Sequence, residues 1–310
     1  MLRIAVPDLI SNSYFPAIAA VELGFFKSEG YDATIDLLFP IPKTFEALRD
    51  GALDFVVGSA HATLLAFPEW QGAKLLAAVG QHTYWFLVIR SDLKPKHGDL
   101  SIVKGLRIGA APGVNLSLQR MLVEAGIDPE KNNVQIMPIP GAAGPTVSFG
   151  LSAAKALEDG KLDGFWANGM GCEVAVRRGV GTMVLDVRRG DGPSPARDYT
   201  FSALVATDKR IKAEPESARA AVRALMKAHK ALKENVECAT EVGNKRFPPS
   251  EAELIAELVR RDLPYYDPTI PETKVASMNR FARDIGLLRA DVPYEQVVAT
   301  EFSHLWKEPV

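Results

Sequence analysis

The pattern A-L-x-D-G-x-L-D occurs twice in this chain, at residues 47–54 and 156–163. In each copy Ala-Leu suits the last turn of a helix on a sheet, Asp-Gly suits the turn that ends it, and Leu-Asp begins a strand. Repetition of this frame points to two similar α/β halves. The alternative is that Asp-Gly ends two unrelated helices before two unrelated strands.

The elements around the two copies follow the same order. LRIAVP at 2–7 is echoed by LRIGAAP at 106–112, and a Gly/Pro-rich loop is expected at 138–145. Alternating strand and helix signals predict βαβ units and a mostly parallel sheet in each half. The predicted strands are Leu2–Val6, Ala33–Phe39, Leu53–Val57, Val134–Ile139 and Leu162–Trp166, and the predicted helices are Tyr14–Leu23, Thr44–Arg49, Ser117–Ala125 and Ser152–Leu157.

The last third of the chain predicts one more strand and then helices. A strand is expected at Tyr199–Val205, followed by helices at Pro215–Val236, Ser250–Val259 and Thr273–Ile285. A chain of 310 residues exceeds a typical single domain, so we expect two lobes with the late helices covering the first. Lobe I is predicted at residues 1–90 and 200–310 and lobe II at 91–199, joined by a two-segment hinge with crossovers near Arg90–Leu93 and Asp198–Thr207.

Charge and motifs exclude several function classes. The 36 basic and 38 acidic residues are interspersed, which predicts no nucleic-acid partner. No apolar run reaches the ~18 residues of a membrane span, so no membrane insertion is expected. Cys172 and Cys238 lack metal or redox spacing and are expected as free thiols, with a disulfide left open. No metal site and no cofactor are expected, since neither ligand spacing nor a nucleotide-binding glycine motif occurs.

The predicted ligand site lies beyond the carboxyl ends of the parallel strands, where open α/β sheets bind ligands. Two such sheets facing each other would bury a ligand in a cleft between the lobes. The candidate residues follow the first and third strand of each half, and they are Ser11, Asn12, Ser13, Tyr14, Ser59, His61, Asn115, Ser117, Trp166 and Asn168.

Each candidate also has a structural interpretation. The two loops after the first strands precede helices, whose N–H groups favour anions, but Ser13 and Asn115 also suit simple helix caps. Trp166 suits stacking on a planar ligand or packing between lobes. Among the histidines, His61 in a strand-end loop is favoured, and His82 follows; His97, His229 and His304 are expected to be structural.

The run PAIAAVELGFFKSEGYDATI at 16–35, followed by ALRDGALDFVVGS at 47–59, resembles substrate-binding proteins of the sulfonate, nitrate and thiamine-precursor group. AGID at 125–128 and DVPYEQVV at 291–298 are similar too, so the resemblance spans the chain. It implies the two-lobed type 2 periplasmic-binding-protein fold, which closes about its hinge on a ligand. It also implies capture of a small organic anion or planar heterocycle, delivery to an ABC transporter permease and a periplasmic location. A monomer is expected, because the sequence shows no heptad repeat and no extended apolar surface stripe.

Two further functions stay open at this point. Some similar proteins are enzymes, namely a desulfinase with a cysteine in the loop after the first strand and a pyrimidine synthase with a cysteine-rich motif. Here that loop carries Ser11, Asn12 and Ser13, so no enzyme is expected, although His61 suits a base for Ser11. The start MLRIAVPDL shows no export signal, which is expected either of a cytoplasmic enzyme or of a binding protein whose signal peptide has been removed. A sensor subunit that docks to another protein is the third possibility.

Overall fold

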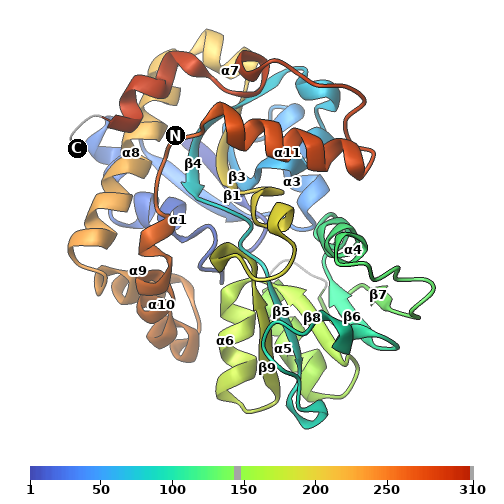
Figure 1. The fold of residues 1–310 in the computed structure, drawn as a ribbon. Coiled ribbons are helices and arrows are strands. Elements are labelled where there is room, and N and C mark those ends of the chain that lie inside the picture. The colour runs from blue at the N-terminus through green and yellow to red at the C-terminus, as the bar shows by residue number, and fades with distance from the viewer. Residues whose placement is uncertain (143–147, 308–310) are drawn as a thin grey trace. The chain divides into compact units, whose positions relative to one another are not determined.

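The computed structural model describes residues 1–142 and 148–307, which form two compact units (Figure 1). Unit 1 comprises Met1–Gln81 and Thr200–Val310, and unit 2 comprises His82–Tyr199. The predicted Gly/Pro-rich loop at 138–145 lies partly outside the described residues. Within the described ranges, no helix is both long enough and apolar enough to cross a bilayer.

The sheet of unit 1 is five-stranded and has the order β2-β1-β3-β10-β4. β1 pairs in parallel with β2 and β3, whereas β10 pairs antiparallel with β3 and β4. The strands are β1 (Leu2–Val6), β2 (Ala33–Leu37), β3 (Phe55–Ser59), β4 (Ala73–Gly80) and β10 (Ser202–Thr207).

The sheet of unit 2 repeats this plan with the order β7-β6-β8-β5-β9. β6 pairs in parallel with β7 and β8, and β5 pairs antiparallel with β8 and β9. The strands are β5 (Phe86–Arg90), β6 (Arg107–Ala110), β7 (Gln135–Met137), β8 (Gly164–Ala167) and β9 (Gly181–Asp186). The prediction of two mixed, mostly parallel sheets flanked by helices is therefore confirmed. The antiparallel strand of each sheet directly follows a crossing between the units: β5 is the first strand after the chain enters unit 2, and β10 is the first after it returns to unit 1.

Residues 82–90 correct the predicted extent of lobe I. The first crossing lies between Gln81 and His82 rather than near Arg90. β5 joins the second sheet because its backbone bonds lie there: Phe86 is opposite Ala167 on one side and Asp186 on the other. The strand expected from Tyr199 begins only at Ser202. Hinge motion about the two crossings stays a prediction.

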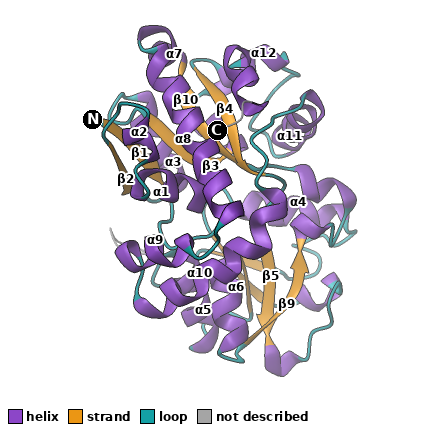
Figure 2. Ribbon diagram, turned by 90° about the vertical axis from the view of Figure 1, so that its left-hand side faces the viewer, coloured by secondary structure: helices purple, strands orange, loops and turns teal. Residues whose placement is uncertain are grey.

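Helices flank the first sheet, and most of those in the described residues of unit 1 follow β10 in the chain (Figures 1 and 2). The longest, α8, buries an apolar stripe that contains Ala218, Ala221, Val222 and Leu225. This stripe follows the helical repeat, so one face packs inward while lysines and arginines remain outside. The helices of unit 1 are α1 (Phe15–Glu22), α2 (Phe25–Ser28), α3 (Ile41–Arg49), α7 (Asp208–Ala213), α8 (Pro215–Glu234), α9 (Cys238–Arg246), α10 (Pro249–Asp262), α11 (Glu272–Asp284) and α12 (Tyr294–Val297).

The second sheet is flanked by α4 (Asn115–Glu124), α5 (Phe149–Glu158) and α6 (Gly169–Arg177). α5 and α6 approach each other at two glycines. A Cβ on Gly171 would lie 2.6 Å from the carbonyl oxygen of Gly150, which is closer than real Cβ atoms come. Only glycine therefore permits this helix contact.

The aspartate of the repeated Leu-Asp makes the same set of hydrogen bonds with a neighbouring strand in both units. We call this set the aspartate bracket. The backbone N–H of Arg3 donates to Asp54 Oδ2 at 2.7 Å, and that of Arg107 donates to Asp163 Oδ2 at 3.0 Å. In return the N–H groups of Asp54 and Asp163 donate to the carbonyls of Arg3 and Arg107, both at 2.9 Å. The aspartate thus ties β1 to β3 in unit 1 and β6 to β8 in unit 2.

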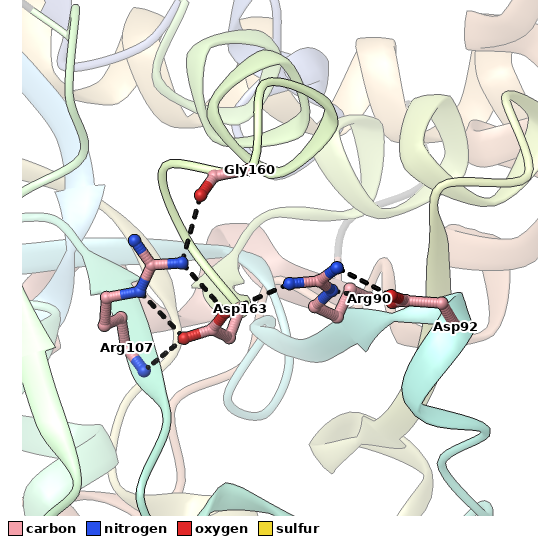
Figure 3. A network of polar contacts seen from close by, with 5 residues as sticks. All are labelled: Arg90, Asp92, Arg107, Gly160 and Asp163. Carbon is pink, nitrogen blue, oxygen red and sulfur yellow. Dashed lines mark hydrogen bonds and ion pairs between the residues drawn. The ribbon is translucent and has the colours of Figure 1, made fainter.

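A second arginine extends each bracket to the antiparallel strand. Arg210, just after β10, lies 2.8 Å from Asp54, and Arg90, at the end of β5, lies 3.4 Å from Asp163 (Figure 3). Both brackets sit at the amino ends of the parallel strands. The aspartate of the repeated sequence therefore joins three strands at the amino ends of each sheet. The residues at the carboxyl ends of the strands are not part of this contact, so they can differ between the two sheets.

Candidate functional sites at the carboxyl edges of the two sheets

The strand register of unit 1 gathers its predicted residues at one edge. Ser202, the first residue of β10, lies opposite Ser59 on one side and Gly80 on the other. Because β10 is antiparallel, its start meets the carboxyl ends of β3 and β4. The residues around Ser59, the segment before Ser202 and the loop after β1 therefore share this edge.

The loop after β1 is held by buried side chains. The amide Nδ2 of Asn12 donates to Asp262 Oδ2 at 2.7 Å, and both residues are buried. The backbone N–H of Ser13 donates to Ser11 Oγ at 3.1 Å, while Ser13 Oγ is buried without a hydrogen-bond partner in the described residues. Tyr14, not Ser13, is the residue that precedes α1, and its side chain makes no capping bond. A cap does not explain Ser13.

His61 is fixed by a threonine that the sequence did not single out. Its Nδ1 lies 2.9 Å from the hydroxyl of Thr200, and both residues are buried. That hydroxyl also accepts from the His61 backbone N–H at 3.4 Å, and Phe201 O is 3.4 Å away. Since Nδ1 is the nearer acceptor, we assign the threonine proton to it. The neutral imidazole then carries its own hydrogen on Nε2, which makes Nε2 a donor.

The second sheet presents its own residues at the corresponding edge. Ala110 lies opposite Trp166, and Phe86 lies opposite both Ala167 and Asp186. The loop after β6, the residue after β8 and the segment after β9 therefore lie at the carboxyl edge, together with the residues that precede Phe86.

Asn115 stabilises its own loop. Its Oδ1 accepts from the N–H of Gly113 at 3.0 Å, and Gly113 has a φ of 88°, which glycine adopts without strain. The N–H groups of Val114 and Asn115 both donate to the carbonyl of Ala111. Val114, not Asn115, precedes α4. These backbone N–H groups, which were predicted to bind an anion, thus donate hydrogen bonds within the loop itself.

Ser117 and Trp166 bond to each other. The indole Nε1 donates to Ser117 Oγ at 2.9 Å, and that hydroxyl donates to Val114 O at 2.6 Å. Trp166 is only 1% exposed, and the ring of Trp85 lies 6.1 Å from it at 55°. The pair joins α4 to the sheet within unit 2, whereas the packing interpretation expected a contact between the lobes. Ligand contact by either residue stays a prediction.

Asn168 directly precedes α6, a helix that the sequence analysis did not predict. Its Oδ1 accepts from the N–H of Gly171 at 3.1 Å, which is a helix cap. Contact between Asn168 and a ligand stays a prediction.

Arg188, which follows β9 at the edge of the second sheet, was not among the predicted residues. Its side chain is 6% exposed, whereas the side chain of Arg189 is 57% exposed. Nε of Arg188 lies 3.5 Å from Asp186 Oδ1, and the guanidinium carbon lies 5.0 Å from the centre of the Phe86 ring. In sequence the stretch D-V-R-R-G-D-G looks like a solvated turn. The position of this stretch directly after a buried strand was the sequence signal that could have placed Arg188 at the edge of the sheet.

Three further histidines have structural partners. His82 Nδ1 lies 2.8 Å from Asp198 in unit 2, and His97 Nε2 lies 3.2 Å from Asp191. His229 Nε2 lies 2.8 Å from the carbonyl of Val79, and burial lowers the pKa of this histidine to about 4. In the part of the chain that the structure describes, no group of three His, Cys, Asp or Glu side chains suits a metal ion.

A family model described as NMT1/THI5 like matches residues 11–239 of this chain. A putative binding protein, YtlA of Bacillus subtilis, is 23% identical over 304 residues, which cover 94% of this chain and 85% of the relative.

Solved structures share the fold over nearly the whole chain. The periplasmic nitrate-binding protein NrtA of Synechocystis PCC 6803 has a TM-score of 0.74 at 16% identity, over 98% of this chain and 87% of its own. A putative periplasmic sulfonate-binding protein SsuA of Methylobacillus flagellatus KT has a TM-score of 0.69 at 19% identity, over 98% and 93%. The desulfurization enzyme DszB has a TM-score of 0.66 at 15% identity, over 99% of both chains.

Proposed function

Because this chain belongs to the NMT1/THI5-like family, we propose that it is a solute-binding protein that captures a small organic anion or planar heterocycle for an ABC importer. The family match over residues 11–239 carries the proposal. Delivery to a transporter permease and a periplasmic location belong to the same proposal. Binding proteins for nitrate and sulfonate with the same fold support it.

The chemistry of the two edges supports binding rather than a fixed catalytic group. The unit 1 edge offers hydroxyls and the imidazole of His61, and the unit 2 edge offers the guanidinium of Arg188. Such groups hydrogen-bond to oxyanions and to heteroatoms of rings. Capture would couple to hinge closure if the closed state made more ligand contacts than the open one, because a ligand shifts an equilibrium only by that difference.

An enzyme is the second candidate, favoured by the similarity to DszB. The thiols of this chain argue against thiol chemistry in the loop after β1. That loop carries Ser11, Asn12 and Ser13, whereas Cys172 lies in α6 and Cys238 begins α9. Incubation with aromatic sulfinates and assay of released sulfite tests the enzyme. Sustained sulfite release would replace the binding proposal.

A thermal-shift screen tests the proposed function directly. The probes are nitrate, alkyl- and arylsulfonates, benzoates and pyrimidines, with a polyamine as the negative comparison. A ligand present at 100 times its Kd stabilises the folded state by about 2.7 kcal/mol, which is easily seen. We expect at least one acid or heterocycle to raise the Tm and to bind in calorimetry. Stabilisation by the polyamine alone would contradict the proposal.

A further inference from the structure

We infer that the two crossings between the units are joined by a clamp inside unit 2, which makes them bend as a single hinge. The clamp consists of the side-chain pair His82 and Asp198 and the backbone hydrogen bond between Thr83 and Arg197. Unit 2 begins at His82 and ends at Tyr199, so the clamp adjoins both crossings. This inference goes beyond the proposed function, because it concerns a motion of the chain itself and is tested without a solute.

The contacts of the clamp are short and partly shielded from solvent. His82 Nδ1 lies 2.8 Å from Asp198 Oδ1, and the two side chains are 19% and 35% exposed. The N–H of Thr83, which is buried, donates to the carbonyl of Arg197 at 2.8 Å. Solvent screens a partly buried pair less than an exposed one. The chain segments that enter and leave unit 2 are therefore tied to each other next to the crossings.

The backbone of His82 is constrained as well as its side chain. Its φ is 64°, in the left-handed region that residues other than glycine seldom adopt. Such a conformation persists where the surrounding contacts hold it. The bonds of His82 to Asp198 and of the next residue, Thr83, to Arg197 are contacts of this kind. The clamp thus fixes the direction that the chain takes directly after the first crossing.

On the unit 1 side, the residues next to the crossings are held within unit 1. The backbone N–H of Gln81 donates to Tyr265 O, and its side-chain amide donates to Asp267 O, both at 2.8 Å. The hydroxyl of Thr200 lies 2.9 Å from His61 Nδ1. Because each crossing is fastened on both sides, each time inside one unit, rotation is concentrated in the few backbone bonds of the crossings themselves.

The two crossings keep a fixed spacing on either side. In unit 1, Ser202 after the second crossing lies opposite Gly80 before the first, because β10 and β4 are neighbours in the sheet. In unit 2, the clamp holds His82 against Asp198. Two connections with a fixed spacing define one axis, about which the units swing without twisting. Loss of the clamp releases the spacing on the unit 2 side and adds twisting to that swing.

His97 and Asp191 form a matched control pair. They too lie within unit 2, where His97 Nε2 is 3.2 Å from Asp191 Oδ2, and neither residue adjoins a crossing. His97→Ala therefore takes a histidine away from a carboxylate, as a clamp variant does, and leaves the crossings intact. Asp198→Asn is the second control, since its amide oxygen still accepts a hydrogen bond from His82 Nδ1.

The experiment measures how widely the units move in the full chain without solute. Spin labels are attached to Lys209→Cys in unit 1 and Lys104→Cys in unit 2, both at exposed positions. The background carries Cys172→Ala and Cys238→Ser, which removes the two native thiols. Pulsed electron paramagnetic resonance then gives the distribution of distances between the labels.

We expect Asp198→Ala and His82→Gly to widen the distance distribution by about half or more, because twisting is added to the swing. Hydrogen exchange at the Thr83 amide should rise about fivefold in both variants, because its bond to Arg197 loses the support of the side-chain pair. Asp198→Asn and His97→Ala should match the wild type in both measurements.

Asp198→Ala and His82→Gly disrupt the clamp from opposite sides, so a folding defect in one, seen by circular dichroism, leaves the other as the test. A distribution as narrow as that of the wild type in a folded clamp variant, or equal widening by His97→Ala, would overturn the inference. Neither result bears on the proposed function, which the thermal-shift screen tests separately.

Discussion

Asp163 accepts hydrogen bonds from both the backbone N–H and the side-chain Nε of Arg107, at 3.0 and 2.9 Å. The hydrogen bond from the Arg107 side chain is the largest cause that lowers the pKa of Asp163 to about 2. Asp54 makes the equivalent backbone contact with Arg3 in unit 1. One aspartate in each unit therefore joins the strands of its sheet at their amino ends.

Asp163→Asn should destabilise the protein by about 2 kcal/mol at pH 7. The folded pKa of about 2 lies below the ordinary aspartate pKa of 3.8, so the stabilisation is present above about pH 4. It is lost as the pH falls toward 2. Urea unfolding of wild type and variant at several pH values measures this, and the two curves should converge in acid.

Asp92→Asn is the control for this variant. Asp92 also pairs with Arg90, but its side chain is 62% exposed. Solvent screens such pairs, so this variant should stay close to wild type at neutral pH. An equal loss in both variants would contradict the role given to Asp163.

His229→Gln should flatten the acid dependence of stability. Burial lowers the pKa of His229 to about 4 from 6.5, so the unfolded state takes up a proton more readily than the folded state. The contribution of neutral His229 to the free energy of unfolding is therefore complete above pH 6.5, and it falls by about 3 kcal/mol as the pH drops to 4. Glutamine keeps a donor for Val79 O and does not titrate in this range.

Urea unfolding of wild type and His229→Gln between pH 7 and 4 tests this prediction. The difference between their unfolding free energies should shift in favour of the variant as the pH falls. Parallel curves for the two proteins would refute it.

Thr200→Val should release the His61 ring. Loss of the 2.9 Å bond removes the partner of a buried Nδ1, which costs about 1–3 kcal/mol, whereas Thr200→Ser restores the hydroxyl. In ¹⁵N NMR spectra we expect the wild type and the serine variant to hold the Nε2–H tautomer. The valine variant should shift toward the other tautomer or a mixture. An Nδ1–H tautomer in the wild type would show that the assignment is reversed.

Gly171→Ala should destabilise unit 2 by about 1–3 kcal/mol or more, because its Cβ would meet Gly150 O at 2.6 Å. Ser152→Ala on the neighbouring helix α5 is the control, since it removes atoms at a half-buried position. Thermal unfolding and hydrogen exchange of α5 and α6 would measure the difference. Similar effects of the two variants would rule out the close glycine contact.

Local patterns predicted much of the framework. The strand at Leu2–Val6 has the predicted bounds, and α8 ends within two residues of its prediction, because alternation and helical periodicity are local signals. The sheet that receives β5 was not predicted correctly. Phe86–Arg90 reads as a buried strand in either lobe, and its place depends on partners such as Ala167, about eighty residues away in sequence.

The site was harder to predict than the framework for the same reason. Ser59, His61 and Asn168 were chosen as candidates because each lies at or just after the end of a recognisable strand. Thr200 and Arg188 escaped notice because their significance comes from burial and from the ends of antiparallel pairing. A local pattern predicts where a strand stops, whereas the neighbours at that edge depend on the order of the whole sheet.

The placement of β10 also governs the order in which a ribosome releases foldable segments. All five strands of unit 2 lie between residues 86 and 186, so its sheet is complete in the nascent chain before residue 202 has been made. β3 and β4 must meanwhile wait with their facing edges open, since the strand between them comes last. During translation the later-encoded unit is thus the first able to fold, and the amino-terminal strands are the ones that need protection from aggregation.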